Sequence, residues 1–578
     1  MDSVNPGPVI DGKPSSSLDQ SHRVPEQSQT LSSQHEDLNN SSQRGNEPNH
    51  PRTRDSFEGD IERSSELFDD KERQDSSALT SSANSVYVAK QELEQPPYHI
   101  FSMAKKRQLV YIVSLAGLFS PLSSNIYFPA LKEISTDLNV SLSLVSLTVT
   151  VYMIVQGLAP SFWGQSVTQK VRRRITFMGT FIVYLASNIG LALSDNFATL
   201  MVFRAIQAAG SAATIAVLES LGISLLLKNA EVSLVYFGGI RMLGQSVGPV
   251  FGGIITQYLG YRAIFWFLFG LGALALLLIV AVLPETLRSV AGNGSIILKG
   301  IHRPLFYAQP STEHSSQELP TKKNVTVSSV IAPLKFLLEK DVFVTLLFGA
   351  IIYTVWSMVT SSTTALFSEH FDLTNLELGL IFLPNGAGCI CGSYLTGYLM
   401  DYNYKVVESR YREQHNVPAD VHIKANELLD FPIEVARMRN IWWIIIVFIV
   451  TTALYGYSLS LEIIALPLVL QFFIAYTATA VFSSNSALII DLYPGKSASA
   501  TAVNNLSRCL LGAAGVAAVQ PIIDALGSGV TFLIFAGITF ACSPLLLLEW
   551  YHGGRWRRER AEKLEKKEEA KRATDLER

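Results

Sequence analysis

The chain has 578 residues, of which 48% are hydrophobic and 16% are charged, and its formal net charge is −3 at pH 7. Charged residues gather outside long apolar runs, and the mean hydropathy of +0.26 is positive over the whole chain. This composition excludes a string of ordinary soluble domains and indicates a protein that crosses a membrane many times. The near-neutral charge balance gives no indication of a nucleic-acid partner.

Residues 1–100 are expected to form a disordered tail, because they are rich in Ser, Gln, Asn, Asp and Glu and contain few aromatic residues. No secretory signal is recognisable at the start of the chain. The cysteines lie in apolar stretches, so buried small side chains are expected there rather than disulfides or a zinc site. They are Cys389, Cys391, Cys509 and Cys542. No nucleotide loop, metal cluster or nucleophile constellation is recognisable, so we expect no enzyme, metal or cofactor.

Membrane-length apolar segments follow the tail. Crossing ~30 Å of hydrocarbon takes about 20 apolar residues, and a spanning segment must be helical because lipid offers no partner to backbone amides. The sequence therefore predicts an all-α membrane protein with twelve transmembrane helices. The expected spans are 109–131, 144–165, 175–194, 199–222, 233–258, 263–283, 342–366, 377–400, 441–459, 464–490, 498–523 and 529–550.

Basic residues in the short loops predict that both termini face the cytoplasm, since Lys and Arg are retained on that side. The cytoplasmic set holds Lys105, Lys106, Arg107, Lys170, Arg172, Arg173, Arg174, Lys228 and Lys496, whereas the opposite set holds only Lys132 and Arg262. We expect a six-helix half at 101–283, a cytoplasmic linker at 284–341, a second half at 342–550 with a longer loop at 401–440, and a charged cytoplasmic tail at 551–578. That last segment is expected to be a charged amphipathic helix or tail at the inner surface of the membrane, and contact with lipid and simple solvation are equally good interpretations of it.

Three arginines interrupt the predicted spans: Arg204 in the fourth, Arg241 in the fifth and Arg508 in the eleventh. A cation at the centre of a spanning helix costs about 2.5–3.5 kcal/mol on insertion scales, so such a residue normally faces a cavity or a partner. Carboxylates are nearly absent from the spans, and guanidinium groups form bidentate bonds to carboxylates. These charges favour an anionic substrate. An internal hydrogen-bond clamp is the alternative for each arginine, most of all for Arg241.

Polar side chains in the spans are further candidates for a substrate site. Gln207 lies three residues after Arg204, so the two side chains share one helix face. The other candidates are Asn125, Gln156, Gln245, Asn385, Gln471, Asn485, Asn504 and Asn505. Among them we select Asn125, Gln156, Asn385, Asn485 and Asn504 as substrate-binding residues beside the arginines. Bridging two helices is an equally good interpretation of any single amide.

A glycine motif in the fifth span is the most specific local pattern. It reads Gly244-Gln-Ser-Val-Gly248-Pro249-Val-Phe-Gly252-Gly253. Glycines at every fourth residue let two helices approach closely, and proline kinks the span. Generic helix packing would explain the glycines alone, but it would not require the whole pattern.

This motif resembles the antiporter motif of the drug:proton antiporter branch of the major facilitator superfamily. Arg204-Ala-Ile-Gln207 resembles the fourth-span motif of that branch, and Gly397-Tyr-Leu-Met-Asp401 resembles the second-half copy of its loop motif. Gly164, Arg172 and Arg173 occupy the first-half copy. Within the family, Phe431-Pro-Ile-Glu-Val-Ala-Arg-Met-Arg439 is most similar to fungal citrate exporters.

The resemblance covers about residues 100–550 and implies two six-helix halves around a central site that is reached by alternating access. It implies that Arg204 and Gln207 are critical for transport, that Gly164, Arg172, Arg173, Gly397 and Asp401 form gate loops, and that transport is coupled to protons. No residue is assignable as the proton carrier from the sequence.

Two stretches depart from the family pattern. The first-half loop reads Gly164-Gln-Ser-Val-Thr168-Gln-Lys-Val171-Arg172-Arg173, without the usual acid and second glycine, and residues 217–233 read VLESLGISLLLKNAEVS. Reverse translation with a shift of one base permits the family string in the second stretch, and an acid at 168 with a glycine at 171 in the first. We therefore hypothesise compensated frameshifts in the gene or its sequencing, with true divergence as the alternative. The coding DNA decides between them.

The sequence thus predicts a multi-pass plasma-membrane transporter that exports citrate or a similar carboxylate, with the lipid bilayer as its solvent. A multidrug or secondary-metabolite exporter of the same superfamily is one alternative. A nontransporting or inactive copy is another, because the first-half loop motif is damaged.

Overall fold

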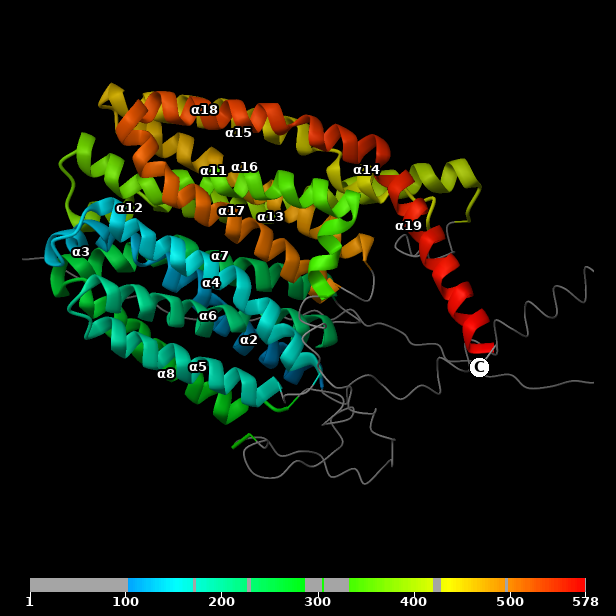
Figure 1. The fold of residues 1–578 in the computed structure, drawn as a ribbon, viewed down its shortest axis with the longest axis horizontal. Coiled ribbons are helices and arrows are strands. Elements are labelled where there is room, and N and C mark those ends of the chain that lie inside the picture. Colours follow the sequence, from blue (N-terminus) through cyan, green and yellow to red (C-terminus); the bar gives the residue numbers. More distant parts are fainter. Residues whose placement is uncertain are drawn as a thin grey trace, which may run out of the picture. The chain divides into compact units, whose positions relative to one another are not determined.

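The computed structural model describes residues 102–169, 173–225, 230–285, 304–305, 332–418, 428–493 and 497–576. Every regular element in these ranges is a helix, as predicted (Figure 1). The predicted tail at 1–100 and most of the predicted linker at 284–341 lie outside the described residues. Residues 96–578 form one unit by their internal contacts.

The first set of helices runs from residue 103 to residue 282. Two short elements after the first long helix carry the chain to the second. The elements are α2 (Met103–Asn125), η1 (Phe128–Ala130), α3 (Leu131–Asp137), α4 (Leu142–Gln169), α5 (Arg173–Ala192), α6 (Phe197–Leu225), α7 (Ala230–Leu259) and α8 (Arg262–Val282).

The second set runs from residue 332 to residue 576 and repeats the pattern of long helices joined by short turns. Its elements are η3 (Ala332–Leu338), α11 (Lys340–His370), α12 (Asn375–Leu380), α13 (Leu383–His415), α14 (Ile433–Met438), α15 (Ile441–Ser458), η4 (Leu459–Leu461), α16 (Ala465–Leu492), α17 (Ser497–Leu526), α18 (Ser528–Cys542) and α19 (Pro544–Leu576).

Ten helical segments among the described residues are long and apolar enough to cross a membrane. They coincide with ten of the expected spans, and α6 and α7 lie at the positions of the fourth and fifth expected spans. The all-α membrane class is therefore confirmed, whereas the count of twelve spans stays a prediction. Large apolar side chains on the outer helices support the class, since Leu277 of α8 is 65% exposed and Phe540 of α18 is 70% exposed.

Two helices continue past the apolar segments that we expected to span the membrane. The eighth span was expected to end at 400, but α13 runs to His415 through residues that we had assigned to a loop. That extension is amphipathic: Asn403, Val407 and Tyr411 are buried at helical spacing, and its exposed side carries an ion pair of Glu408 with Arg412 at 2.8 Å. Likewise α4 continues to Gln169 beyond the expected end at 165.

The helix of the last expected span also continues past its expected end. The helix bends at Ser543, and α19 then runs without a break across residue 550, where we had expected the tail to begin. Its second half, residues 562–574, is exposed. The tail is thus helical up to Leu576.

Helices of the two sets pack against each other as well as within each set. In the first set α2 packs on α7, and α5 packs on α6 and α8; in the second, α13 packs on α16, and α15 packs on α16 and α18. The sets meet where α4 contacts α17 and where α7 contacts α13. In Figure 1 these four helices lie between α5 and α8 on one side and α15 and α18 on the other.

Candidate functional site

A cavity lies where the two sets of helices meet. Its wall comes from α2, η1, α4 and α7 of the first set and from α11, α16 and α17 of the second. The polar lining residues are Ser124, Asn125, Gln156, Gln245, Ser357, Thr360, Thr479 and Arg508, and the aromatic ones are Phe128, Tyr353, Trp356 and Phe482. Among the described residues that line it, Arg508 is the only charged one.

Arg508 is held by stacking and by one amide. Its guanidinium carbon lies 4.5 Å from the ring centroid of Phe482 and 4.9 Å from that of Tyr353. Its Nε and Nη2 donate to Asn505 Oδ1 at 3.2 and 2.8 Å. A guanidinium has five N–H donors, so these two bonds leave donor capacity for a ligand in the cavity. Aromatic faces also orient the planar group without neutralising its charge.

Asn505 connects Arg508 to the other half. Its Nδ2 donates to the backbone oxygen of Gln156 on α4 at 3.1 Å, and α4 and α17 approach closely there. A Cβ at Gly157 would lie 2.8 Å from Cys509 Cβ, so the contact requires glycine at that position. The cation of the second half is therefore positioned against a polar wall of the first.

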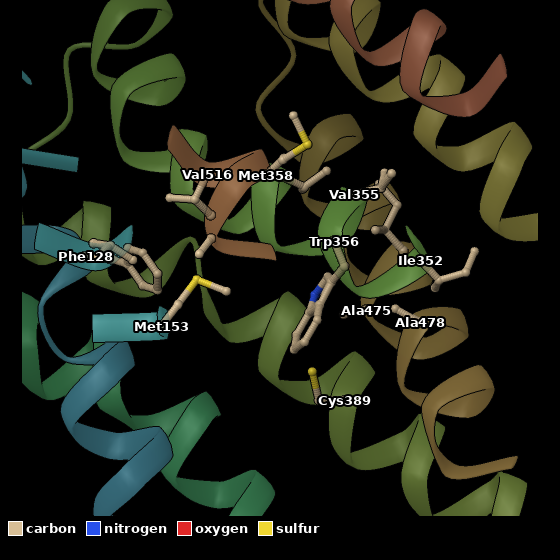
Figure 2. Close-up of a cluster of buried hydrophobic side chains, with 14 of the residues drawn as sticks. Phe128, Met153, Ile352, Val355, Trp356, Met358, Cys389, Ala475, Ala478 and Val516 are labelled. Atoms are coloured by element: carbon tan, nitrogen blue, oxygen red, sulfur yellow. The ribbon is translucent and has the colours of Figure 1, made fainter. Parts of the chain in front are cut away.

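Trp356 forms another part of the cavity wall, next to Tyr353. Its Nε1 donates to Asn385 Oδ1 at 2.9 Å, so Asn385 lies behind the indole and orients it. Figure 2 shows Trp356 from α11, with Phe128 and Met153 from the first set of helices around the same central region. Cys389 lies beside the indole and is fully buried and unbonded to another cysteine, as expected.

Arg204, our first candidate for the substrate contact, does not line the cavity. It is 1% exposed, and its guanidinium carbon lies 4.0 Å from the ring centroid of Tyr127 and 4.6 Å from that of Tyr152. Its Nη1 donates to Gln207 Oε1 at 2.7 Å and to the Ser123 backbone oxygen at 3.3 Å. These contacts form a clamp inside the first set of helices, which is the alternative that the sequence left open.

Gln207 extends this clamp to α5. Its Nε2 donates to Asn188 Oδ1 of α5 at 2.8 Å, and both side chains are fully buried. One hydrogen-bond chain links the clamp to the cavity wall. Gln156 donates to Ser120 Oγ at 2.8 Å, and the hydroxyl of Tyr152 donates to the Ser120 backbone oxygen at 3.2 Å.

Two other predicted amides bridge helices. Asn485 donates to the Thr345 backbone oxygen of α11 at 3.2 Å and lies where Gly349 leaves room for it. Asn504 donates to Ser486 Oγ of α16 at 3.0 Å. Neither lines the cavity, whereas Asn125, Gln156 and Arg508 do. The side chain of Arg241 lies outside the described residues.

Several polar and aromatic residues of the cavity lie outside our selection; the polar ones are Gln245, Ser124, Ser357, Thr360 and Thr479, and the aromatic ones are Phe128, Tyr353, Trp356 and Phe482. Gln245 stood among the polar candidates but was not selected, and Asn505 was passed over in favour of its neighbour Asn504. A usable signal was present for the aromatic wall, because Tyr353 and Trp356 lie three residues apart and therefore share a helix face.

The glycine motif makes two separate helix contacts. A Cβ at Gly244, Gly248 or Gly252 would lie 2.9, 3.2 or 2.0 Å from backbone atoms of α2 or of Ile126. A Cβ at Gly253 would lie 2.6 Å from the Asn375 oxygen and 2.9 Å from the Gly379 Cα, on the other half. Pro249 lies inside α7, and the Gly379 position faces its backbone oxygen. The motif therefore joins α7 to both halves at once.

Further contacts join the halves beside Gly253. The rings of Phe128 and Phe382 stack with centroids 5.7 Å apart, and Thr364 Oγ1 donates to the Phe128 backbone oxygen at 3.0 Å. The backbone N–H of Asn375 donates to Gln257 Oε1 at 3.1 Å. Phe128 also lines the cavity, so these contacts join the two halves at its edge.

The predicted gate residues are described only in part. Gly164 belongs to α4, Arg173 begins α5, and Arg172 lies outside the described residues. Gly397 and Asp401 lie within α13 rather than in a loop, which corrects the expectation for that segment. Arg174, which we had counted as a loop cation, is buried, and its guanidinium binds backbone oxygens at Val280 and Leu283, where α8 ends.

Comparison with known proteins identifies the family. The model of the Major Facilitator Superfamily matches residues 113–516. Citrate exporter 1 of Aspergillus niger is 59% identical over 82% of this chain and 91% of its own length. The MFS-type transporter phiD of a fungal species is 34% identical over 89% of this chain and 79% of its own length, and the MFS antiporter QDR2 of Candida albicans is 29% identical over 78% and 89%.

A solved structure shares the fold. The human organic anion transporter MFSD10 (TETRAN) aligns with a TM-score of 0.50 at 17% identity, over 78% of this chain and all of that one. The family match and the transporters among the relatives agree with the prediction that the chain is not an enzyme. The chain belongs to the major facilitator superfamily.

Proposed function

We propose that this chain is a multi-pass plasma-membrane transporter that exports citrate or a similar carboxylate. The observation that carries the proposal is the charge of the cavity: among its described lining residues Arg508 is the only charged one, and neutral amides and hydroxyls supply the other polar groups. A partly buried guanidinium whose printed hydrogen bonds go to an amide oxygen rather than to a carboxylate suits an anionic ligand. The identity of 59% to a protein named citrate exporter supports this substrate class.

In this proposal Arg508 pairs with a substrate carboxylate, and Asn505 positions it. Gln156, Asn125 and Gln245 offer hydrogen bonds to the hydroxyl and the remaining carboxylates. Arg204 and Gln207 keep the first half rigid behind the cavity wall. This changes our ranking of the two arginines, since we expected Arg204 to make the first contact with substrate.

Alternating access then needs the contacts around Gly253 and Phe128 to open, because they join the two halves at the edge of the cavity. We expect the glycine motif to act as the hinge for that step, with both termini and the gate segments near Gly164 and Asp401 on the cytoplasmic side. By the family resemblance, the proposal also includes twelve spans, two six-helix halves and coupling of transport to protons.

A second candidate is export of a larger acidic metabolite. The aromatic lining by Phe128, Tyr353, Trp356 and Phe482 favours it, because flat rings accept varied apolar groups. The 34% identity to an MFS-type transporter and the 29% identity to an antiporter are consistent with this wider class. Cationic drugs fit a cavity with a lone arginine poorly.

The test is extracellular citrate from a yeast that does not secrete it. Cells express the full chain, Arg508→Ala or an empty vector, and surface expression is measured for each. Citrate that rises only with the intact arginine supports the proposal. Unchanged citrate with normal surface expression contradicts citrate export; release of another carboxylate would then favour the second candidate, and no transport at all would indicate an inactive copy.

A further inference from the structure

A cluster of charged side chains lies away from the cavity, where α19 packs against α11 and α14. It contains Asp341 of α11, Glu434 of α14, and Glu549, Arg557 and Arg560 of α19. The three acids are 1%, 2% and 0% exposed. Three buried acids beside two arginines would leave one negative charge uncompensated, so the pairing within the cluster decides which acid lacks a cation.

The ion pairs of both arginines are with the other two acids. Arg560 forms an ion pair with Asp341, and its Nη1 donates to the Tyr493 hydroxyl at 2.7 Å. Arg557 lies 3.8 Å from Glu434 Oε2, and its Nη2 donates to the Leu429 and Phe431 backbone oxygens. Its charge therefore compensates Glu434 and the carbonyls of the segment before α14.

Glu549 is the acid that these pairs leave out. Neither of its carboxyl oxygens has a hydrogen-bond partner among the described residues, although the side chain is fully buried. Asp341 and Glu434 are the acids that act on it, and both would repel a further negative charge, whereas the more weakly acting Arg560, which is paired with Asp341, would attract it. From α15 the nearby contact is uncharged, since Trp442 packs against Trp550. An ionised carboxylate in this position would be desolvated, unpaired and repelled.

The backbone makes room for this group. A Cβ at Gly553 would lie 3.0 Å from Glu549 Oε1 and 2.8 Å from Glu434 Cγ, so the two acidic side chains occupy the space beside one glycine. Burial raises the pKa of the Glu434 carboxyl even though the positive charge of Arg557 lowers it. The surroundings thus disfavour a second negative charge beside Glu434.

We propose that Glu549 is a proton-binding site of the second half, which carries its proton while α19 is packed against α11 and α14 and releases it when α19 separates from them. A neutral carboxyl removes the repulsion by Asp341 and Glu434 and leaves both ion pairs intact. The site is independent of which substrate the cavity binds.

The test uses the purified full-length protein in detergent. Thermal unfolding is followed from about pH 5 to about pH 9, a range that brackets documented protonation of buried glutamates. Glu549→Gln mimics the protonated side chain, and Glu562→Gln is the matched control because Glu562 is exposed on the same helix. We expect Glu549→Gln to unfold at a higher temperature than the parent at alkaline pH, with the difference vanishing in acid, and Glu562→Gln to follow the parent throughout.

Infrared spectroscopy supplies a second measurement that does not depend on the variant folding well. The parent should show the carbonyl band of a protonated carboxylic acid at neutral pH, and Glu549→Gln should lack that component whereas Glu562→Gln keeps it. A parent without such a band at neutral pH, or a Glu549→Gln protein that is destabilised equally at every pH, would overturn the proposal.

Discussion

The surroundings of Arg204 and Arg508 differ, although both arginines interrupt apolar helices. Arg204 is enclosed by two tyrosine rings, a glutamine and a backbone oxygen, all within the first half. Arg508 lines the cavity and is fixed by Asn505 and by two rings of the second half. A buried cation thus stabilises helix packing in one region and stays available to a ligand in the other.

The region around Arg204 depends on close contact of α7 with α2, because α2 supplies Ser123 to the clamp. The largest effect is therefore expected for Gly252→Ala, whose Cβ would lie 2.0 Å from the Ile126 oxygen. Backbone must move to relieve that overlap, at a cost of about 3 kcal/mol. We expect loss of most folded protein in size-exclusion chromatography. Gly270→Ala in α8, where a Cβ meets nothing within 4 Å, should behave like the parent.

The second-largest effect is expected from removing the clamp that Arg204 forms. Arg204→Leu leaves Gln207 and the Ser123 oxygen without their buried partner, which costs about 2–3 kcal/mol. The thermal unfolding temperature should fall clearly, while transport per folded molecule at the surface stays within about threefold, which is ~0.7 kcal/mol. Normal stability combined with abolished transport would instead return Arg204 to the substrate site.

Two replacements of Arg508 test whether this arginine contacts the substrate. Arg508→Ala removes a charge-assisted pair and should reduce citrate export about 10- to 100-fold, equivalent to ~1.5–3 kcal/mol. Arg508→Lys keeps the charge but loses the planar donor array, so an intermediate rate is expected. Equal rates for the parent and both variants, measured at equal surface expression, would show that this arginine makes no contact with substrate.

Asn505→Ala should have the smallest effect. It removes the amide that fixes Arg508 and the bond to the Gln156 oxygen, worth about 1 kcal/mol in positioning. We expect a roughly fivefold weaker apparent affinity for citrate with little change in maximal rate, measured by uptake into inside-out vesicles. Asn504→Ala, which loses only the bridge to Ser486, is the matched control. A larger loss of apparent citrate affinity in Asn504→Ala than in Asn505→Ala would contradict the assignment of Asn505 as the residue that positions Arg508.

The helices could be predicted from the sequence, because apolar length alone identifies a span. The extension of α13 to His415 was missed for the same reason. Its residues are charged, and its buried face consists of single residues at helical spacing rather than an apolar run. The break at Ser543 and the continuous α19 likewise lie where apolar length gives no information.

The two arginines could not be ranked from the sequence. Each lies within an apolar segment, and the rings that distinguish them, Tyr127 and Tyr152 for Arg204 and Tyr353 and Phe482 for Arg508, come mostly from other helices. Which face of a spanning helix meets the cavity depends on the packing of the two halves. The same limit applies to Asn504 and Asn505, which are adjacent in sequence but point to different helices.

Direct citrate binding to the purified full-length protein tests the central claim most directly. The dissociation constant is measured for the parent, Arg508→Gln and Arg204→Gln, each corrected for its folded fraction. The account predicts that Arg508→Gln weakens binding about 10- to 100-fold, whereas Arg204→Gln binds like the parent but unfolds at a lower temperature. Unchanged binding by Arg508→Gln together with lost binding by Arg204→Gln would contradict it.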